Sequence, residues 1–114
     1  MSNFLCYTQV MTKNPLIKYQ KQISDLAKKH QISYLALFGS HARGEAQINS
    51  DIDLLVDFKE TPGWVELYDV EQDYKKLFNK DIDMVEAAGI NKYVKPYILP
   101  DLITLYGQRP ASLS

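Results

Sequence analysis

A chain of 114 residues, 46% apolar and 24% charged, has room for one hydrophobic core and no second globular unit. Thirteen Lys and Arg against 14 Asp and Glu give a formal net charge of −1, which argues against a stable nucleic-acid binder. The single cysteine, Cys6, has no partner for an internal disulfide, so we expect a reducing compartment, the cytoplasm. No apolar run approaches the roughly 20 residues of a membrane span, so no membrane partner is expected.

The first half of the chain reads as an arm, a helix, a strand and a polar connection. Residues 1–14 have no periodic pattern and are expected to form a loose N-terminal arm, with a single domain over 15–110. Apolar residues recur at spacings of three and four over 15–30, which predicts an amphipathic helix. ISYLALF (32–38) is short and apolar and precedes a Gly-Ser pair, which predicts a strand. The polar stretch 41–50 is helix-compatible at first and turn-like later.

The second half repeats the alternation of strand and helix. Hydrophobicity alternates from residue to residue in DIDLLVDF (51–58) and DIDMVE (81–86), which predicts two strands. Between them, residues 64–78 have the apolar spacing of an amphipathic helix. Residues 91–107 are expected to form one or two short helical segments interrupted near two prolines, and the last few residues are expected to fray. In the strand over 51–58, one face is fully apolar and the other, expected to point out of the core, carries Asp51, Asp53, Leu55 and Asp57.

Three features that bear chemistry fall at the ends of predicted strands. Gly39 and Ser40 follow the first strand, Asp51 and Asp53 open the second, and Asp83 lies on the third. Alternation puts Asp51 and Asp53 on one face, about 7 Å apart, from which two carboxylates can bridge a pair of divalent cations. A glycine lets the backbone approach a ligand closely, and a serine hydroxyl can bond a phosphate oxygen. The combination indicates a site for a metal-bound triphosphate.

Each feature alone has a plainer interpretation. A Gly-Ser pair is usually just a turn, and a single Asp-x-Asp is usually a solvated strand face. A calcium loop that starts at Asp51 fits poorly, because Leu55 and Val56 stand where Asp or Asn and Gly are required. The ten-residue spacing between the two motifs, in a strand–turn–strand context, is more specific than either motif.

The segment GSHARGEAQINSDIDLLVDF (39–58) closely resembles the signature of the minimal nucleotidyltransferase family, within the DNA-polymerase-beta-like nucleotidyltransferase superfamily. DIDMVE (81–86) resembles the third strand of that family, and the resemblance covers about 32–107. It implies an α/β (α+β) fold with a small mixed β-sheet flanked by helices. It also implies transfer of a nucleoside monophosphate from a nucleoside triphosphate, with pyrophosphate leaving.

Carried onto this sequence residue by residue, the resemblance implies a nucleotide subsite and a metal subsite. Asp83 matches the third carboxylate of the family, which ligates the catalytic metal and helps to deprotonate the acceptor hydroxyl. Asp81 lies on the same face and remains a rival for that role. Arg43 is a candidate charge-assisted donor to phosphate, with a solvent-facing side chain as the alternative. The implied nucleotide-binding residues are Gly39, Ser40 and Arg43, and the implied catalytic ligands of two Mg²⁺ are Asp51, Asp53 and Asp83.

The acceptor is expected to be another protein, because the chain carries little besides the nucleotide-handling core. Stand-alone members that resemble it are typically prokaryotic antitoxins paired with a HEPN-type RNase toxin. The resemblance implies transfer of AMP from ATP to a tyrosine of that toxin, within a hetero-oligomer. Two alternatives stay open: an antitoxin that inhibits its partner by contact alone, and transfer of the nucleotide to a small molecule.

Other residues with chemical potential are assigned plainer roles. His30 is expected to be a helix cap or a surface residue, and His41 looks structurally free although it could approach phosphate. Trp64 and the eight tyrosines could stack on a base, but their helical spacing favours core packing. Cys6 lies in the arm and is given no catalytic role.

Overall fold

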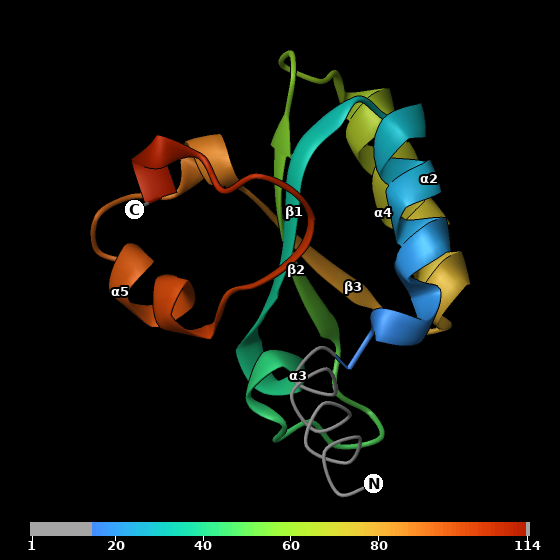
Figure 1. Ribbon diagram of the computed structural model, residues 1–114, viewed down its shortest axis with the longest axis vertical. Coiled ribbons are helices and arrows are strands. Elements are labelled where there is room, and N and C mark those ends of the chain that lie inside the picture. The colour runs from blue at the N-terminus through green and yellow to red at the C-terminus, as the bar shows by residue number, and fades with distance from the viewer. Residues whose placement is uncertain (1–14, 114) are drawn as a thin grey trace, which may run out of the picture.

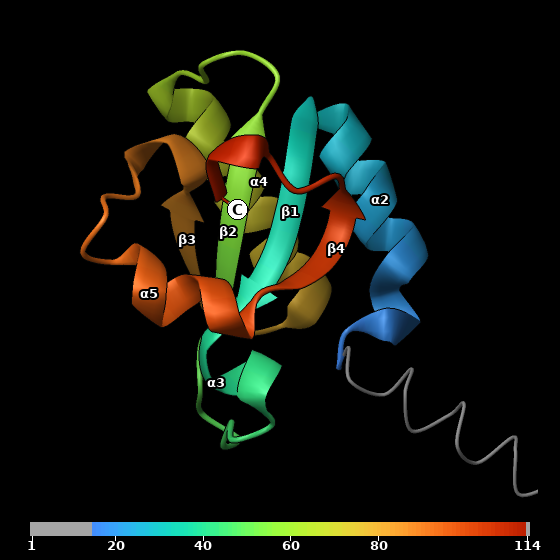
Figure 2. The same cartoon turned by 60° about the vertical axis from the view of Figure 1, so that its left-hand side comes forward.

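Four strands form one mixed sheet in the computed structural model, which describes residues 15–113 (Figures 1 and 2). The strand order is β3-β2-β1-β4, with β1 antiparallel to β2 and β4, and β2 parallel to β3. The fold class predicted from the sequence, a small mixed sheet flanked by helices, is confirmed. The strands are β1 (Ile32–Phe38), β2 (Ile52–Phe58), β3 (Ile82–Glu86) and β4 (Ile103–Gly107).

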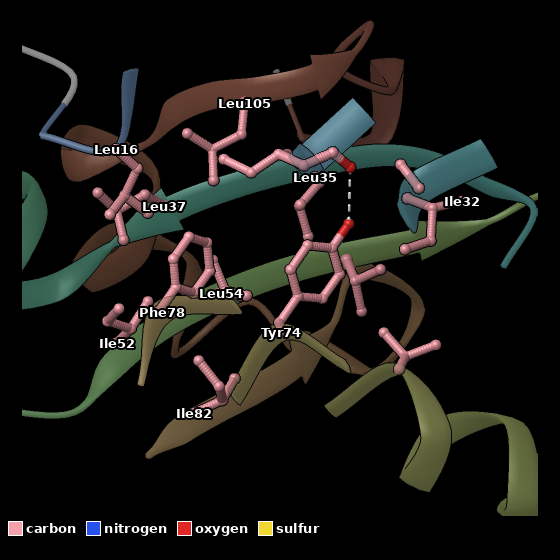
Figure 3. Close-up of a cluster of buried hydrophobic side chains, with 14 residues drawn as sticks. Leu16, Ile32, Leu35, Leu37, Ile52, Leu54, Tyr74, Phe78, Ile82 and Leu105 are labelled. Atoms are coloured by element: carbon pink, nitrogen blue, oxygen red, sulfur yellow. Dashed lines mark hydrogen bonds between the residues drawn. The ribbon is translucent and has the colours of Figure 1, made fainter. Parts of the chain in front are cut away.

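Two long helices cover one face of this sheet, as Figure 1 shows. They are α2 (Gln20–Lys29), entered through the 3₁₀ turn η1 (Ile17–Tyr19), and α4 (Trp64–Phe78), and both lie where the apolar spacing predicts them. The Tyr74 hydroxyl donates to the Ile23 carbonyl at 3.0 Å and so ties the two helices together inside the core. Figure 3 shows the hydrophobic cluster between these helices and the sheet, whose buried members include Ile23, Leu35, Leu37, Ile52, Leu54, Val56, Val70, Tyr74 and Phe78.

The opposite face of the sheet is covered by the C-terminal part of the chain (Figure 2). Leu55 is fully buried there with Tyr34, Ala36 and Leu113. The expectation that the whole Leu55 side of β2 points out of the core is therefore wrong, because Leu55 is covered, whereas Asp51 is exposed and Asp53 and Asp57 are half-buried. The covering elements are the turns η2 (Ala87–Gly89), η3 (Leu99–Asp101) and η4 (Ala111–Leu113) and the short helix α5 (Lys95–Ile98).

The stretch after Pro100 differs from its sequence prediction. Two short helical segments do form, α5 and η3, with Pro96 and Pro100 in their first turns, but residues 103–107 form strand β4 rather than helix. These residues pair with the edge of β1 that β2 leaves free, and Gly107 (φ +79°) lies so close to the Ser33 backbone that a side chain would not fit. Because Leu113 is buried, the prediction that the last residues fray is also wrong for that position.

Two side chains lie in environments that the sequence pattern does not suggest. His30 is only 4% exposed, with its Nδ1 2.8 Å from Glu66 Oε2 and its Nε2 2.7 Å from Asp73 Oδ2. His30 is the C-cap residue of α2, as one of the two predictions has it, and its buried side chain also links α2 to α4, so only the prediction of a surface residue is wrong. Trp64, the first residue of α4, is 90% exposed, so core packing is the wrong prediction for it.

None of the helices within residues 15–113 is long and apolar enough to cross a bilayer. The predicted arm over 1–14, including Cys6, lies outside the described residues.

Candidate functional site

The Gly-Ser turn lies directly against one of the predicted metal ligands. Phe38 ends β1 in extended conformation, and Gly39 then turns the chain with φ +76° into the short helix α3 (Gly39–Arg43). A Cβ atom at Gly39 would overlap the Asp53 carboxylate. Glycine is required here for two reasons: the left-handed backbone conformation and the absence of a side chain beside Asp53.

Strand pairing brings the predicted carboxylates together on one face. Phe38 is the antiparallel partner of Asp53, and Asp53 is the parallel partner of Asp83. Paired residues on neighbouring strands point to the same side of a sheet, so the Gly39 turn, Asp53 and Asp83 follow one another across β1, β2 and β3. Asp51 is two residues before Asp53 on that side. Asp53 is half-buried, whereas Asp51 and Asp83 are exposed.

The pKa of Asp53 reports the electrostatics of this site. Burial raises its pKa above the ordinary value, and the nearby Asp83 and Asp51 raise it further, while His41 and Arg43 act in the opposite direction. Ionised carboxylates that repel each other in a partly buried place are relieved by a cation. The site therefore carries an excess of negative charge at the point where the sequence predicts metal.

The two candidates for the third carboxylate differ in their surroundings. Asp83 lies directly beside Asp53 in the strand register and contributes to its pKa. The Asp81 carboxylate forms an ion pair with Lys75 of α4, with 3.1 Å between Lys75 Nζ and Asp81 Oδ1. The backbone carbonyl of Asp81 accepts a hydrogen bond from Ile52 N at 2.9 Å. The register favours Asp83 as the partner of Asp53.

Arg43 is exposed to solvent, as one of its two interpretations has it, and its guanidinium also contacts two carboxylates. Its Nε donates to Glu45 Oε1 at 2.9 Å and its Nη1 donates to Asp101 Oδ2 at 2.7 Å. These hydrogen bonds raise the pKa of Arg43 above its usual value. The Asp101 contact joins α3 to η3, so the C-terminal segment braces the Gly-Ser turn. The sequence gives no signal for this pair, because 58 residues separate its members and an irregular turn positions Asp101.

His41 has a structural contact within the site. Its Nε2 lies 3.2 Å from the Ser50 carbonyl, which connects α3 to the residue just before Asp51. The interpretation of His41 as structurally free is therefore incomplete, since the ring helps to position the loop that leads into β2.

The donor chemistry of the site fits a hard divalent cation, because every candidate ligand is a carboxylate oxygen. Across residues 15–113, no three His, Cys, Asp or Glu side chains are gathered closely enough to hold a metal ion as they stand. The strand register brings the backbone positions of these residues close together, but among the described residues their carboxylate groups do not converge as a set of three.

Comparison with known proteins agrees with this arrangement. Residues 21–110 match the sequence model of the family described as polymerase beta, nucleotidyltransferase. The chain belongs to this nucleotidyltransferase family. It is 37% identical over 89 residues to a candidate protein adenylyltransferase of Methanocaldococcus jannaschii, an alignment that covers 77% of this chain and 89% of the relative.

Two solved structures share the nucleotidyltransferase fold. A candidate minimal nucleotidyltransferase superposes with a TM-score of 0.68 at 27% identity, covering 80% of this chain and 93% of the other. The complex of a tri-AMPylated HEPN toxin with its MNT antitoxin from Shewanella oneidensis superposes with a TM-score of 0.57 at 20% identity, covering 88% of this chain and 73% of the other. The second likeness shows the fold alone, and the family assignment rests on the sequence matches.

Proposed function

We propose that this nucleotidyltransferase moves AMP from ATP to a hydroxyl group of a partner protein, a HEPN-type RNase toxin, and acts as its antitoxin in the cytoplasm. The observation that carries the proposal is the register of β1, β2 and β3, which places the Gly39 turn, Asp53 and Asp83 side by side. Asp53 and Asp83 belong to one sheet and Gly39 directly follows its strand β1, which supports the view that 15–110 acts as a single domain.

Within this proposal, Gly39 and Ser40 hold the triphosphate, because backbone at a glycine turn can approach phosphate closely. Arg43 is a further phosphate donor, and binding there requires that phosphate compete with Glu45 or Asp101. Asp51, Asp53 and Asp83 are the ligands for two Mg²⁺. Bound Mg²⁺ would supply charge neutralisation at the phosphates.

The transfer step needs an acceptor hydroxyl, which we take to be that of a tyrosine. Its oxygen attacks the α-phosphorus of ATP, forming a new P–O bond as the bond to the β-phosphate oxygen breaks and pyrophosphate leaves. In this proposal Asp83, the exposed member of the pair with Asp53, accepts the hydroxyl proton.

The names of the compared proteins support the choice of AMP and of a protein acceptor. The Methanocaldococcus relative is described as acting on proteins by adenylyl transfer, and the Shewanella antitoxin is found with an AMPylated HEPN toxin. The net charge of −1 also makes a protein a better acceptor than a polyanion such as RNA.

The deciding experiment uses intact-mass spectrometry of the partner toxin after incubation with this protein, ATP and Mg²⁺. The partner should gain mass in whole AMP units, only when both ATP and Mg²⁺ are present, and should stay inactive after this protein is removed. A partner that is fully inhibited but unmodified, and that recovers on separation, would instead support inhibition by contact. Transfer of AMP to an aminoglycoside or another small hydroxyl compound, but not to protein, would support the small-molecule alternative.

A further inference from the structure

The short helix that begins at the Gly-Ser turn has little packing of its own. None of the residues of α3 is buried, and the half-buried Ala42 contacts the main hydrophobic cluster. Two polar contacts join α3 to the rest of the fold: His41 Nε2 lies 3.2 Å from the Ser50 carbonyl, and Arg43 Nη1 donates to Asp101 Oδ2 at 2.7 Å. The position of this turn therefore depends on polar contacts that a single substitution can remove.

Arg43 is the cation of α3 that lies near the proposed phosphate subsite. Residues three apart on a helix lie on the same side, so Arg43 shares a side of α3 with Ser40. Burial and the neighbouring aspartates raise the pKa of Asp53, and the charge of Arg43 acts against them. The guanidinium is thus close enough to act electrostatically at the place where a metal-bound triphosphate would lie.

The two carboxylates that contact Arg43 differ in how firmly they are fixed. The Asp101 side chain is 18% exposed and that of Glu45 is 66% exposed. Asp101 lies between Leu99 and Leu102, which both pack into the hydrophobic cluster on the C-terminal face of the sheet. Glu45 stands just after α3 in an irregular stretch. Exposed ion pairs contribute little to stability, so Glu45 is the partner that a phosphate replaces more easily.

We propose that Asp101 is a positioning residue for the nucleotide, which keeps the Arg43 guanidinium directed at the triphosphate, whereas Glu45 occupies Arg43 Nε until a phosphate oxygen replaces it. The proposal rests on the proposed function, because it takes Gly39, Ser40 and Arg43 to hold phosphate. It gives the C-terminal segment a part in ATP binding, and it assigns opposite effects to two carboxylates on one guanidinium.

The test measures the affinity for MgATP by isothermal titration calorimetry. Asp101→Asn should weaken binding at least about fivefold, because an unheld guanidinium must be ordered by the nucleotide itself. Removal of a negative charge would by itself favour an anionic ligand, so this loss is opposite to the simple charge effect. Glu45→Gln should tighten binding by about two- to fivefold, because the phosphate no longer competes with a carboxylate for Arg43.

Asp25→Asn is the matched control for charge. Asp25 is exposed on α2, which packs on the other face of the sheet, and it pairs with Lys21. This variant makes the same change in net charge and should leave the affinity for MgATP within about twofold of the parent protein, because exposed charges far from the ligand are screened.

A second comparison separates positioning from a merely structural role. In an Arg43→Ala background, Asp101→Asn should have little further effect on MgATP affinity, because Asp101 acts through that guanidinium. If Asp101 only stabilised the C-terminal segment, the same loss would occur with and without Arg43. Circular dichroism of each variant verifies that it is folded.

Three results would overturn the proposal: unchanged or tighter MgATP binding by Asp101→Asn, weaker binding by Glu45→Gln, or an equal effect of Asp101→Asn in the two backgrounds. A parent protein that does not bind MgATP would overturn it together with the proposed function. The transfer reaction is checked separately by the mass of the partner toxin. A protein that shows the expected affinities but never transfers AMP would refute the proposed function and leave Asp101 in its positioning role.

Discussion

At the scale of single residues, the close approach of Gly39 to Asp53 links the proposed phosphate-binding turn to a proposed metal ligand. Any atom added to Gly39 must displace the Asp53 carboxylate, so the turn and the carboxylate cannot vary independently. Two substitutions at this contact separate its steric and electrostatic parts.

Gly39→Ala should destabilise the protein more than Gly44→Ala does. Both glycines have φ near +75°, but nothing lies within 4 Å of a Cβ at Gly44, so that variant has only the backbone strain, about 1 kcal/mol. Overlap with Asp53 should add roughly 1–3 kcal/mol at Gly39. The free energies of unfolding from urea titrations check this, and equal values for the two variants would mean that the Asp53 carboxylate moves aside freely.

Asp53→Asn should abolish transfer and at the same time stabilise the protein at pH 7. The folded-state pKa of Asp53 is raised, so ionisation of this group opposes folding at pH values above it, and an amide relieves that cost. The stabilisation should vanish as the pH falls through the raised pKa towards 3.8. Loss of a metal ligand should lower transfer by at least about 100-fold. Urea titrations at pH 7 and below pH 4, with a transfer assay at pH 7, measure both effects.

Asp57→Asn is the control for that substitution, because Asp57 is on the same strand and the same side but lies at its far end. It should keep normal transfer. An Asp53→Asn protein that is folded and retains near-normal transfer would contradict the role assigned to Asp53.

How far the sequence predicts the site differs from residue to residue. Gly39, Ser40, Asp51 and Asp53 are found from their motif, because local spacing determines which strand end and which face they occupy. The preference for Asp83 over Asp81 rests on the family resemblance. Its physical basis, the β2–β3 register, depends on a pairing between segments that are distant in the sequence. Arg43 could be named, but its partner Asp101 could not.

At the scale of elements, α2 and α4 are joined by a buried polar link. Both ring nitrogens of His30 lie within hydrogen-bonding distance of carboxylates on α4, and Lys29 Nζ lies 3.1 Å from the same oxygen of Asp73. Burial raises the Asp73 pKa, but the hydrogen bonds from His30 and Lys29 outweigh it and lower the pKa below its usual value.

His30→Ala should cost about 2–3 kcal/mol, because a buried ring is lost and Asp73 and Glu66 lose their partner. The lowered pKa means that Asp73 contributes stability above about pH 3.8 that is lost as the pH falls further. In His30→Ala this acid-dependent loss should be smaller. The exposed pair of Lys21 and Asp25 provides the control, since Lys21→Ala should cost no more than about 0.5 kcal/mol. A His30→Ala cost as small as this would show that the link contributes little to stability.

The elements that the sequence predicts well are those with a long periodic pattern. The helix over 64–78 and the strand over 32–38 agree with the structure at both ends. The sequence does not predict strand β4, because five residues after two prolines carry too short a pattern to distinguish strand from helix. Only the free edge of β1, created by the rest of the fold, determines that these residues pair as a strand.

At the scale of the whole molecule, both faces of the sheet are covered, but within residues 15–113 Asp51 and Asp83 stay exposed at one end of it. The helices α2 and α4 lie on one face, and the C-terminal elements bury Leu55 on the other. The candidate site occupies the end where β1 finishes and β2 and β3 begin (Figure 2). A ligand that binds there contacts several elements at once, so it should stabilise the entire fold.

MgATP should therefore raise the melting temperature by several degrees, and ATP with EDTA should do so much less. A ligand at 100 times its dissociation constant adds about 2.7 kcal/mol, which is large for a domain of this size. Differential scanning calorimetry measures the shift, and Asp53→Asn should lose most of the effect of Mg²⁺. Equal shifts with and without EDTA would argue against metal in the site.

The exposure of Trp64 determines what optical spectroscopy can measure on this protein. It is the single tryptophan of the chain, it is already in water in the folded state, and Figure 1 places the start of α4 at the end of the molecule away from α3. Its emission should change little on unfolding or on binding of ATP, so far-ultraviolet dichroism is the better measure of folding. A blue shift of that emission on addition of a partner would instead indicate a partner large enough to reach past the active-site end and cover the start of α4.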